Sequence, residues 1–272
     1  MVDSVTTLPG TGRTWSRPPF IKKPWVRWGV WLAVAIYLFV AITSMEVDWS
    51  RVIEGLPRGK KFLLAFLPPN FASRWDSIVD GIYESLWMTV TSTVVGIGLS
   101  IPIALGAARN LSHPIVYYSC RGIVALSRTF PEIILAIFFV KLFGFGPFAG
   151  FLALSIATIG FYAKLLAEDI EDMDAVQAEA VKATGAGWLQ WLNYAVQPQV
   201  MPRIIGLGMY RFDINFRESA VVGIVGGGGI GATLLTAFDR YEFDSAAAIL
   251  LVIIGIVMAV EYSSGIIRNH IK

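Results

Sequence analysis

The chain has 272 residues, of which 55% are hydrophobic and 15% are charged, whereas soluble globular domains carry roughly 25% charged residues. A mean hydropathy of +0.62 argues against a cytosolic enzyme, because a soluble fold this apolar would expose large hydrophobic patches to water. The single cysteine and two distant histidines offer no ligand set for a metal, and the formal net charge of +2 gives no indication of a nucleic-acid partner.

Uncharged stretches predict where the chain crosses a membrane, because a bilayer core about 30 Å thick takes roughly 20 apolar helical residues. The segment 1–24, which lies before the first span, mixes Thr, Pro, Gly, Ser and basic residues, and we expect it to be disordered. Residues 25–272 are expected to form one transmembrane domain. Four clear spans are predicted at 28–45, 85–108, 142–163 and 245–260.

Two further spans contain charged residues. The third is predicted at 131–143, where Glu132 and Lys141 lie near the ends and can reach the interface. The fifth is placed at 202–225, because the competing window 219–238 holds six glycines that each cost about 1 kcal/mol in a helix. The glycines are therefore expected in a loop after the fifth helix, and the sequence predicts an all-α membrane protein with six transmembrane helices.

Lysine and arginine accumulate on the segments that this topology places on the side of the N-terminus. Those segments collect 13 of the basic residues, whereas the opposite loops collect six. Because basic residues favour the cytoplasmic side of a membrane, both termini are predicted to be cytoplasmic.

A polar segment, 168–201, separates the fourth and fifth spans and is predicted to face the cytoplasm as a helical hairpin. Asp174 followed by Gln177 resembles a capping box, and Gly185 can end the first helix in the left-handed conformation. A second helix is expected at 187–196, with Pro198 and Pro202 ending it.

The hairpin resembles the EAA signature of bacterial ABC-importer permeases. Glu179, Ala180, Gly185 and Pro198 fall at the spacing of that signature. In that family the loop docks into a groove on the ATP-hydrolysing subunit, so the resemblance implies that these four residues couple the chain to an ATPase. Three positions depart from the signature: Val181, Ala195 and Gln197.

Most of the chain is similar to phosphonate permeases of the PhnE type, within the type I ABC importers. The resemblance implies a type I importer permease fold and a phosphonate-type anion as substrate, with phosphate, phosphite or methionine as alternatives. An intramembrane hydrolase is a remote alternative, because the chain offers no catalytic set at bilayer depth. The segments that carry the resemblance are 128–132, 146–154, 159–161, 183–186 and 217–231.

The resemblance also implies the partners. The chain has no Walker A sequence, so no cofactor is expected in it, and ATP and magnesium are expected on two separate ATP-binding subunits. A second copy of the chain, an extracytoplasmic substrate-binding protein and the lipid bilayer complete the expected partners. The expected location is the inner membrane of a bacterium, as a multi-pass protein.

Charged residues in the fifth span are candidates for the substrate path, because ionisable groups at bilayer depth usually face a protein interior or a water-filled path. Asp213 and Arg217 are four residues apart, and Arg211 and Glu218 are seven apart, so each pair shares a helix face. These pairs either hold helices together or, with Arg128, provide positive potential for a doubly charged anion. Arginine suits the second role because it binds phosphonate oxygens in a bidentate manner.

Glycines after the fifth span also match the dinucleotide-binding pattern Gly-x-Gly-x-x-Gly. The matching residues are Gly226, Gly228 and Gly231. A membrane span precedes them rather than a strand of a βαβ unit, so nucleotide binding is not expected. The glycines are instead predicted to form an outer turn, or a hinge where backbone approaches substrate or partner closely.

Overall fold

The structure is a computed structural model that describes residues 21, 23–45 and 48–271, with side chains described as far as residue 266. Most of the predicted N-terminal segment 1–24 therefore lies outside the described residues. Throughout the described ranges every regular element is a helix. The chain divides into two compact units, Met1–Phe62 and Leu63–Lys272.

The first unit contains α1 (Pro24–Ser44) and most of α2 (Trp49–Leu64). Pro24 occupies the first turn of α1, where its missing N–H would have no helical partner anyway. The 21 residues of α1 give a length of about 31 Å, sufficient to cross a bilayer. The predicted first span is therefore an apolar helix long enough to be a candidate membrane span.

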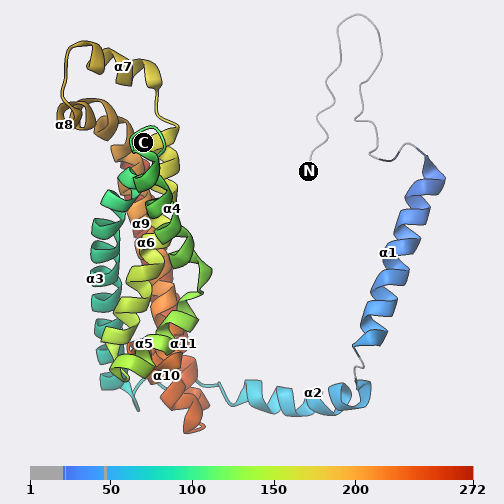
Figure 1. Cartoon of the computed structure of the whole chain (residues 1–272). Coiled ribbons are helices and arrows are strands. Elements are labelled where there is room, and N and C mark those ends of the chain that lie inside the picture. Colours follow the sequence, from blue (N-terminus) through green and yellow to red (C-terminus); the bar gives the residue numbers. More distant parts are fainter. Residues whose placement is uncertain (1–20, 22, 46–47, 272) are drawn as a thin grey trace, which may run out of the picture. The chain divides into compact units, whose positions relative to one another are not determined.

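The second unit is a helical bundle in which four long helices run side by side (Figure 1). The hairpin between α6 and α9 lies at one end of this bundle, and α10 lies at the opposite end. The long helices are α3 (Trp75–Ala107), α6 (Pro147–Glu171), α9 (Gln197–Val222) and α11 (Phe243–Ile271), and the shorter ones are α4 (Pro114–Thr129), α5 (Glu132–Phe143) and α10 (Ile230–Asp239).

The third predicted span needs correction. The segment 131–143 does form α5, but α5 has 12 residues and a length of about 18 Å, too short to cross alone. It forms a bent pair with α4, at an angle of 87°. Phe130 between them is extended because the following Pro131 disfavours helical geometry.

A second bend of 54° separates α9 from α10, where the glycine-rich segment was expected to leave the helix. The first glycines lie in a π-helical turn, η2 (Gly223–Gly227), and the helix kinks within it at Gly226, where the backbone leaves helical geometry. When each bent pair counts as one span, the described residues contain six candidate spans, in agreement with the predicted number.

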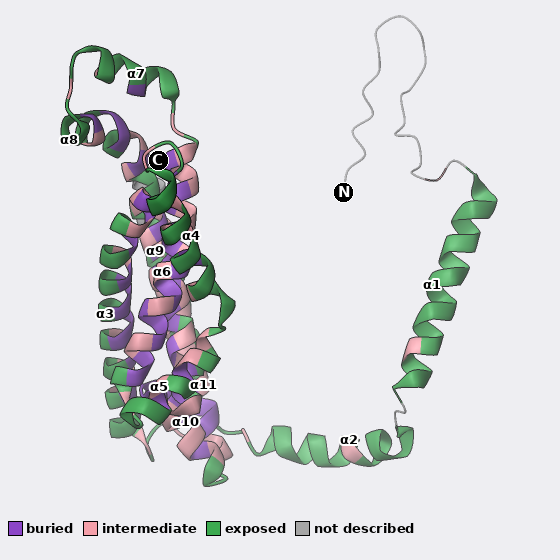
Figure 2. Cartoon of the chain, viewed as in Figure 1, coloured by how far each residue is buried: buried purple, intermediate pink, exposed green. Residues whose placement is uncertain are grey.

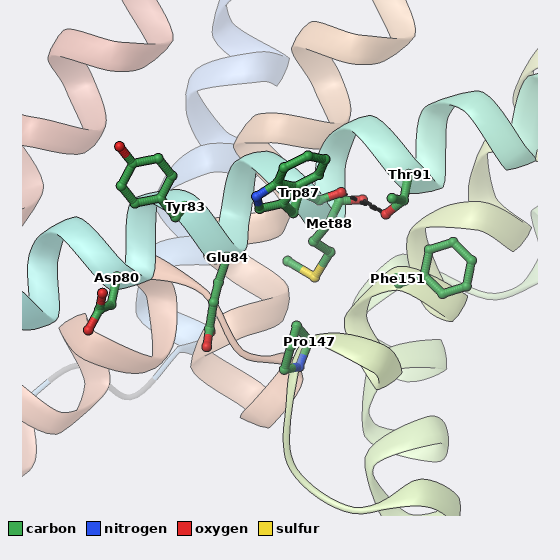
Figure 3. A pocket seen from close by; sticks show the side chains of 8 residues that line it. All are labelled: Asp80, Tyr83, Glu84, Trp87, Met88, Thr91, Pro147 and Phe151. Atoms are coloured by element: carbon green, nitrogen blue, oxygen red, sulfur yellow. Dashed lines mark hydrogen bonds between the residues drawn. The ribbon is translucent and has the colours of Figure 1, made fainter.

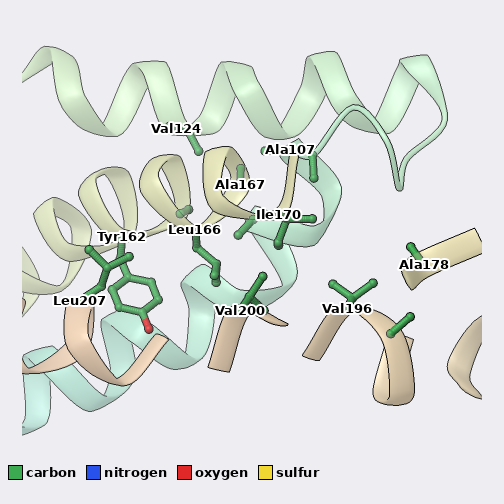
Figure 4. Packing of buried hydrophobic residues seen from close by; sticks show 14 of the residues in the cluster. Ala107, Val124, Tyr162, Leu166, Ala167, Ile170, Ala178, Val196, Val200 and Leu207 are labelled. Atoms are coloured by element: carbon green, nitrogen blue, oxygen red, sulfur yellow. The ribbon is translucent and has the colours of Figure 1, made fainter. Parts of the chain in front are cut away.

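The core lies between α3, α6 and α9, whose inward faces carry the buried residues (Figure 2). Small residues bring these helices together: a Cβ added at Gly96 of α3 would lie 2.6 Å from Thr158 Cβ on α6. The buried Tyr162 donates a hydrogen bond of 2.7 Å to the carbonyl of Ile204, which satisfies its hydroxyl. The largest core cluster, shown in part in Figure 4, includes Tyr162, Leu166, Ile170, Val196, Val200 and Leu207.

Polar contacts join the segment before α3 to the turn between α10 and α11. The Arg74 guanidinium donates a hydrogen bond to Glu242, and Asn70 Nδ2 donates to Asp244 Oδ2 at 3.2 Å. The hydrogen bond from Arg74 lowers the pKa of the Glu242 carboxyl and raises the pKa of Arg74 itself. These contacts fix the turn that connects the last two helices.

Candidate functional site

The predicted hairpin is present as α7 (Ala175–Ala183), α8 (Trp188–Trp191) and a π-helical turn, η1 (Leu192–Val196). Asp174 caps α7, because its carboxylate accepts a hydrogen bond of 2.9 Å from the backbone N–H of Val176. The capping box with Gln177 is replaced by a longer-range contact, since the backbone N–H of Asp174 donates to Gln199 Oε1 at 2.9 Å.

Trp191 holds the two helices of the hairpin together. Its ring is buried, and its Nε1–H donates a hydrogen bond of 2.9 Å to the carbonyl of Ala178 on α7. The Lys182 ammonium lies 4.3 Å from the centre of the same ring, a cation–π contact. The hairpin therefore has internal contacts of its own that fix the position of α7.

The second helix of the hairpin does not end at its prolines, contrary to the prediction. It continues through η1 into α9, with Pro198 in the first turn of α9 and Pro202 inside that helix. The wider π-helical turn η1 lies just before Pro198, and the helix continues although Pro198 has no N–H to donate. The hairpin is consequently continuous with the helix that crosses the bundle.

Glu179 and Ala180 of α7 are exposed, whereas their neighbour Ala178 is buried against Trp191. Gly185 ends the α7 turn with a φ of +83°, the left-handed conformation that was predicted. A groove of about 420 Å³ lies beside α7 and is lined by Val181, Thr184, Gly185, Ala186, Gln190 and Tyr194. The hairpin thus presents an accessible surface that includes the exposed carboxylate of Glu179.

Arg211 is the most deeply buried charge of the bundle among the described residues, with 2% of its surface exposed. Its Nη2 lies 3.3 Å from Glu218 Oε2 and 4.0 Å from Glu132 Oε1 on α5. Its Nε donates a hydrogen bond of 3.0 Å to Thr158 Oγ1 on α6. The predicted Arg211–Glu218 pair is therefore present within α9, and Arg211 also connects α9 to α5 and α6.

Thr158 is the centre of this network, and the sequence pattern did not identify it. Asn215 Nδ2 lies 3.0 Å from Thr158 Oγ1 and 2.8 Å from Thr93 Oγ1 on α3. The sequence pattern indicates only an interfacial position for Glu132, near the end of a span. For Glu132 the sequence did contain a signal, namely a carboxylate at the N-terminus of a short apolar helix. For Thr158 the sequence contains no signal that places it in this network.

Arg217 and Arg211 lie on different faces of α9. Arg217 pairs with Asp213, as the four-residue spacing predicts, and half of its side chain remains exposed. Arg128 at the end of α4 is exposed and has no carboxylate partner among the described residues. Its side-chain stem lies against Gly160 of α6, where an added Cβ would come within 2.8 Å of Arg128 Cγ.

The glycine-rich segment packs tightly against α3 and α6. Glu84 Oε2 accepts a hydrogen bond of 2.8 Å from Gly229 N–H, and Ser85 Oγ accepts one of 3.0 Å from Ile230 N–H. Both acceptors thereby satisfy the N-terminus of α10. Glu84 also lines a hollow of about 450 Å³ between α3 and α6, where Asp80, Tyr83 and Trp87 lie around it (Figure 3).

Close backbone approach explains why this segment is rich in glycine. Gly226 and Gly228 have φ values of +100° and +77°, which other residues rarely adopt. A Cβ at Gly231 would lie 1.9 Å from the carbonyl oxygen of Ala220 on α9. The glycines thus form a packed joint between α9 and α10.

Sequence comparison places the chain in a family. Residues 100–272 match the family described as binding-protein-dependent transport system inner membrane component. The chain belongs to this family. Its members are membrane components of transport systems rather than enzymes, and the predicted importer-permease membership is confirmed.

Curated relatives agree with the PhnE-type resemblance. The chain is 43% identical over 206 residues to the phosphate-import permease PhnE of Mycolicibacterium smegmatis, which is 75% of this chain and 39% of that protein. It is 37% identical over 227 residues to the phosphite transport system permease PtxC of Stutzerimonas stutzeri, covering 83% of this chain and 82% of that one. The chain thus spans about two fifths of the length of the first relative and most of the second.

Solved importer structures share the fold. A chain of the MetNI methionine ABC transporter superposes with a TM-score of 0.65 and 20% identity, covering 74% of this chain and 99% of that chain. An amino acid ABC transporter gives a TM-score of 0.62 at 18% identity, covering 75% and 100%. These likenesses confirm the predicted type I importer permease fold.

Proposed function

We propose that this chain is the transmembrane permease subunit of an ATP-driven importer for phosphonate-type anions. The family match is the observation that carries this proposal. Relatives named for phosphate, phosphite and phosphonate transport support a phosphorus oxyanion as the substrate. Methionine is the alternative, because relatives named for D-methionine transport also match, at 26% identity.

The hairpin is the proposed docking element for the ATPase, which places it in the cytoplasm together with both termini. Its exposed Glu179 can pair with a basic group on the partner, and the small Ala180 allows close approach. Gly185 shapes the turn beside the groove, and Pro198 lies in the first turn of α9, the helix that connects the hairpin to the bundle. ATP and magnesium would be bound by the partner and not by this chain.

The proposed assembly contains two copies of this chain and two ATP-binding subunits in the inner membrane of a bacterium. An extracytoplasmic binding protein would deliver the anion to the opposite face. One hairpin per chain supports this stoichiometry, because ATP-binding subunits of such importers work as a pair. A mass measurement that finds one permease for each ATPase pair would reject it.

Three arginines are proposed to provide the positive potential along the anion path. Arg128 lacks a carboxylate partner among the described residues, and Arg217 remains half exposed beside Asp213. Arg211 is held between Glu218 and Glu132, so an anion would have to compete with two carboxylates for it. Such competition prevents the anion from binding so tightly that it stays in the path.

The same contacts also suit a purely structural role, in which the ion pairs hold the bundle together.

Substrate competition in uptake assays separates the alternatives for the transported substrate. Cells that lack their own phosphorus-oxyanion importers would express this chain with its ATPase and binding protein. Methylphosphonate should compete with labelled phosphonate uptake, and methionine should not. Competition by methionine alone would overturn the substrate assignment.

Charge reversal at Glu179 tests the docking surface. Glu179→Lys should prevent co-purification of the ATPase, or uncouple ATP hydrolysis from uptake. Asp239→Lys is the matched control, because Asp239 is an exposed acid at the end of α10, away from the hairpin. If the ATPase still co-purifies with the Glu179→Lys chain and uptake remains coupled, the docking assignment is wrong.

A further inference from the structure

The helix α2, Trp49–Leu64, has a strongly amphipathic sequence that the transport function does not explain. At 100° per residue five of its seven large apolar residues form a stripe about 100° wide, whereas Leu64 lies at the edge of the stripe and Phe62 falls on the opposite face. Lys60 falls inside the stripe, and its long stem can carry the ammonium to a polar surface. The stripe consists of Trp49, Val52, Ile53, Leu56 and Leu63, and the opposite face carries Arg51, Glu54, Arg58 and Lys61.

No described residue of the first unit covers the apolar stripe. Its five side chains are between 46% and 69% exposed, and no residue of α2 is buried. An exposed apolar stripe of this length on a helix indicates an apolar partner.

Chain connectivity keeps both ends of α2 close to the bilayer. Only residues 45–48 separate it from the end of α1, and four residues span at most about 14 Å. Ten residues, 65–74, separate it from α3. Because α1 and α3 are both candidate membrane spans, the two ends of α2 are tethered at the same membrane face.

The charge of α2 indicates the kind of surface. Four basic residues and one acidic residue lie within its 16 residues, so the helix is attracted to anionic headgroups. Trp49 begins the helix, and tryptophan favours the boundary between headgroups and acyl chains. Basic residues on the polar face and large apolar residues on the other are typical of helices that lie in the membrane interface.

We infer that α2 is an interfacial helix that lies in the plane of the membrane and binds the surface of a bilayer containing anionic lipid. The apolar stripe is immersed at the level where headgroups meet acyl chains, and the basic face binds phosphate groups of the lipids. This inference depends on α1 and α3 crossing the membrane. It holds for either orientation of the chain and does not depend on the transported substrate.

Spin labels on the full-length chain in vesicles test the immersion. In a Cys120→Ala background, labels would be attached at Ile53→Cys and Leu56→Cys on the stripe, and at Glu54→Cys on the polar face as the matched control. The stripe labels should be more accessible to oxygen than to a water-soluble nickel complex, at a depth of about 5–10 Å. The label at position 54 should show the reverse preference.

Two results would overturn the immersion. Equal nickel accessibility at all three positions would mean that α2 lies in water. Stripe labels shielded from both oxygen and nickel would mean that a protein, such as a second copy or a binding protein, covers the stripe.

A change of lipid composition tests whether the basic face of α2 binds anionic headgroups. In vesicles of phosphatidylcholine with increasing phosphatidylglycerol, the immersed fraction of the stripe labels should rise, and added salt should lower it. An immersed fraction that does not change with phosphatidylglycerol would contradict the anionic-lipid part of the inference. Because all three labelled positions are exposed, these substitutions leave the helical bundle intact.

Discussion

Replacing Gly231 with alanine tests whether the joint between α9 and α10 is as tightly packed as the geometry indicates. The added Cβ would lie 1.9 Å from the carbonyl oxygen of Ala220 and 2.9 Å from Gly223 Cα. Both are backbone atoms, so no side-chain rotation can relieve the contact. One of the two helices must move, and overpacking of this kind costs about 1–3 kcal/mol.

Gly98→Ala in α3 provides the matched control, because Gly98 is exposed in a long helix and an added Cβ there meets open space. Alanine at this position should stabilise the helix by about 1 kcal/mol. The two variants should therefore differ by roughly 2–4 kcal/mol in opposite directions from the parent chain. For a chain of this size that corresponds to a difference in Tm of roughly 4–16 °C.

Thermal unfolding of the purified chain, followed by the fluorescence of its nine tryptophans, measures the difference. Gly231→Ala should unfold at the lower temperature, and Gly98→Ala at or above the parent Tm. We expect a Tm difference of at least about 4 °C between the two variants. If Gly231→Ala unfolds within about 2 °C of the Gly98→Ala control, the tight packing of the joint is refuted.

Three further predictions concern the charged and polar contacts. Thr158→Val should destabilise the chain by about 1–3 kcal/mol, because Arg211 loses a buried hydrogen-bond acceptor; an unchanged Tm would contradict the network. Arg217→Gln should abolish uptake but leave the complex assembled, and undiminished uptake at normal expression would remove Arg217 from the path. The Glu242 pKa is lowered in the folded chain, so the pair with Arg74 stabilises the fold above the ordinary glutamate pKa of about 4.3 and is lost as the pH falls. The Tm difference between the parent and Glu242→Gln should therefore disappear in acid, and a difference that persists would contradict this assignment.

The straight spans could be predicted because a single property, the absence of charge over a bilayer thickness, determines them. The helix α9 could be placed as well, since the glycine cost excludes the competing window and α9 ends at Val222, just before the glycines. The bend between α4 and α5 could not be predicted in this way, because a hydropathy argument assumes one straight helix. Pro131 was the local signal for the bend.

In the candidate site, too, contacts within one helix could be predicted from the sequence, whereas contacts between helices could not. The pairs Asp213–Arg217 and Arg211–Glu218 follow from helical spacing, and both are present. The contact between Arg211 and Thr158 joins residues 53 positions apart, so it depends on how α6 packs against α9. Pro198 was misread as a helix end, because proline equally suits the first turn of a helix.

The location of the hairpin tests the account most directly, because the proposed ATPase can reach α7 only from the cytoplasm. A chain with Cys120→Ala and Glu179→Cys would be treated with a membrane-impermeant maleimide, in intact cells and in inside-out vesicles. We predict labelling in the vesicles and none in intact cells. Labelling of position 179 in intact cells would place the hairpin on the outer face and contradict the proposed coupling.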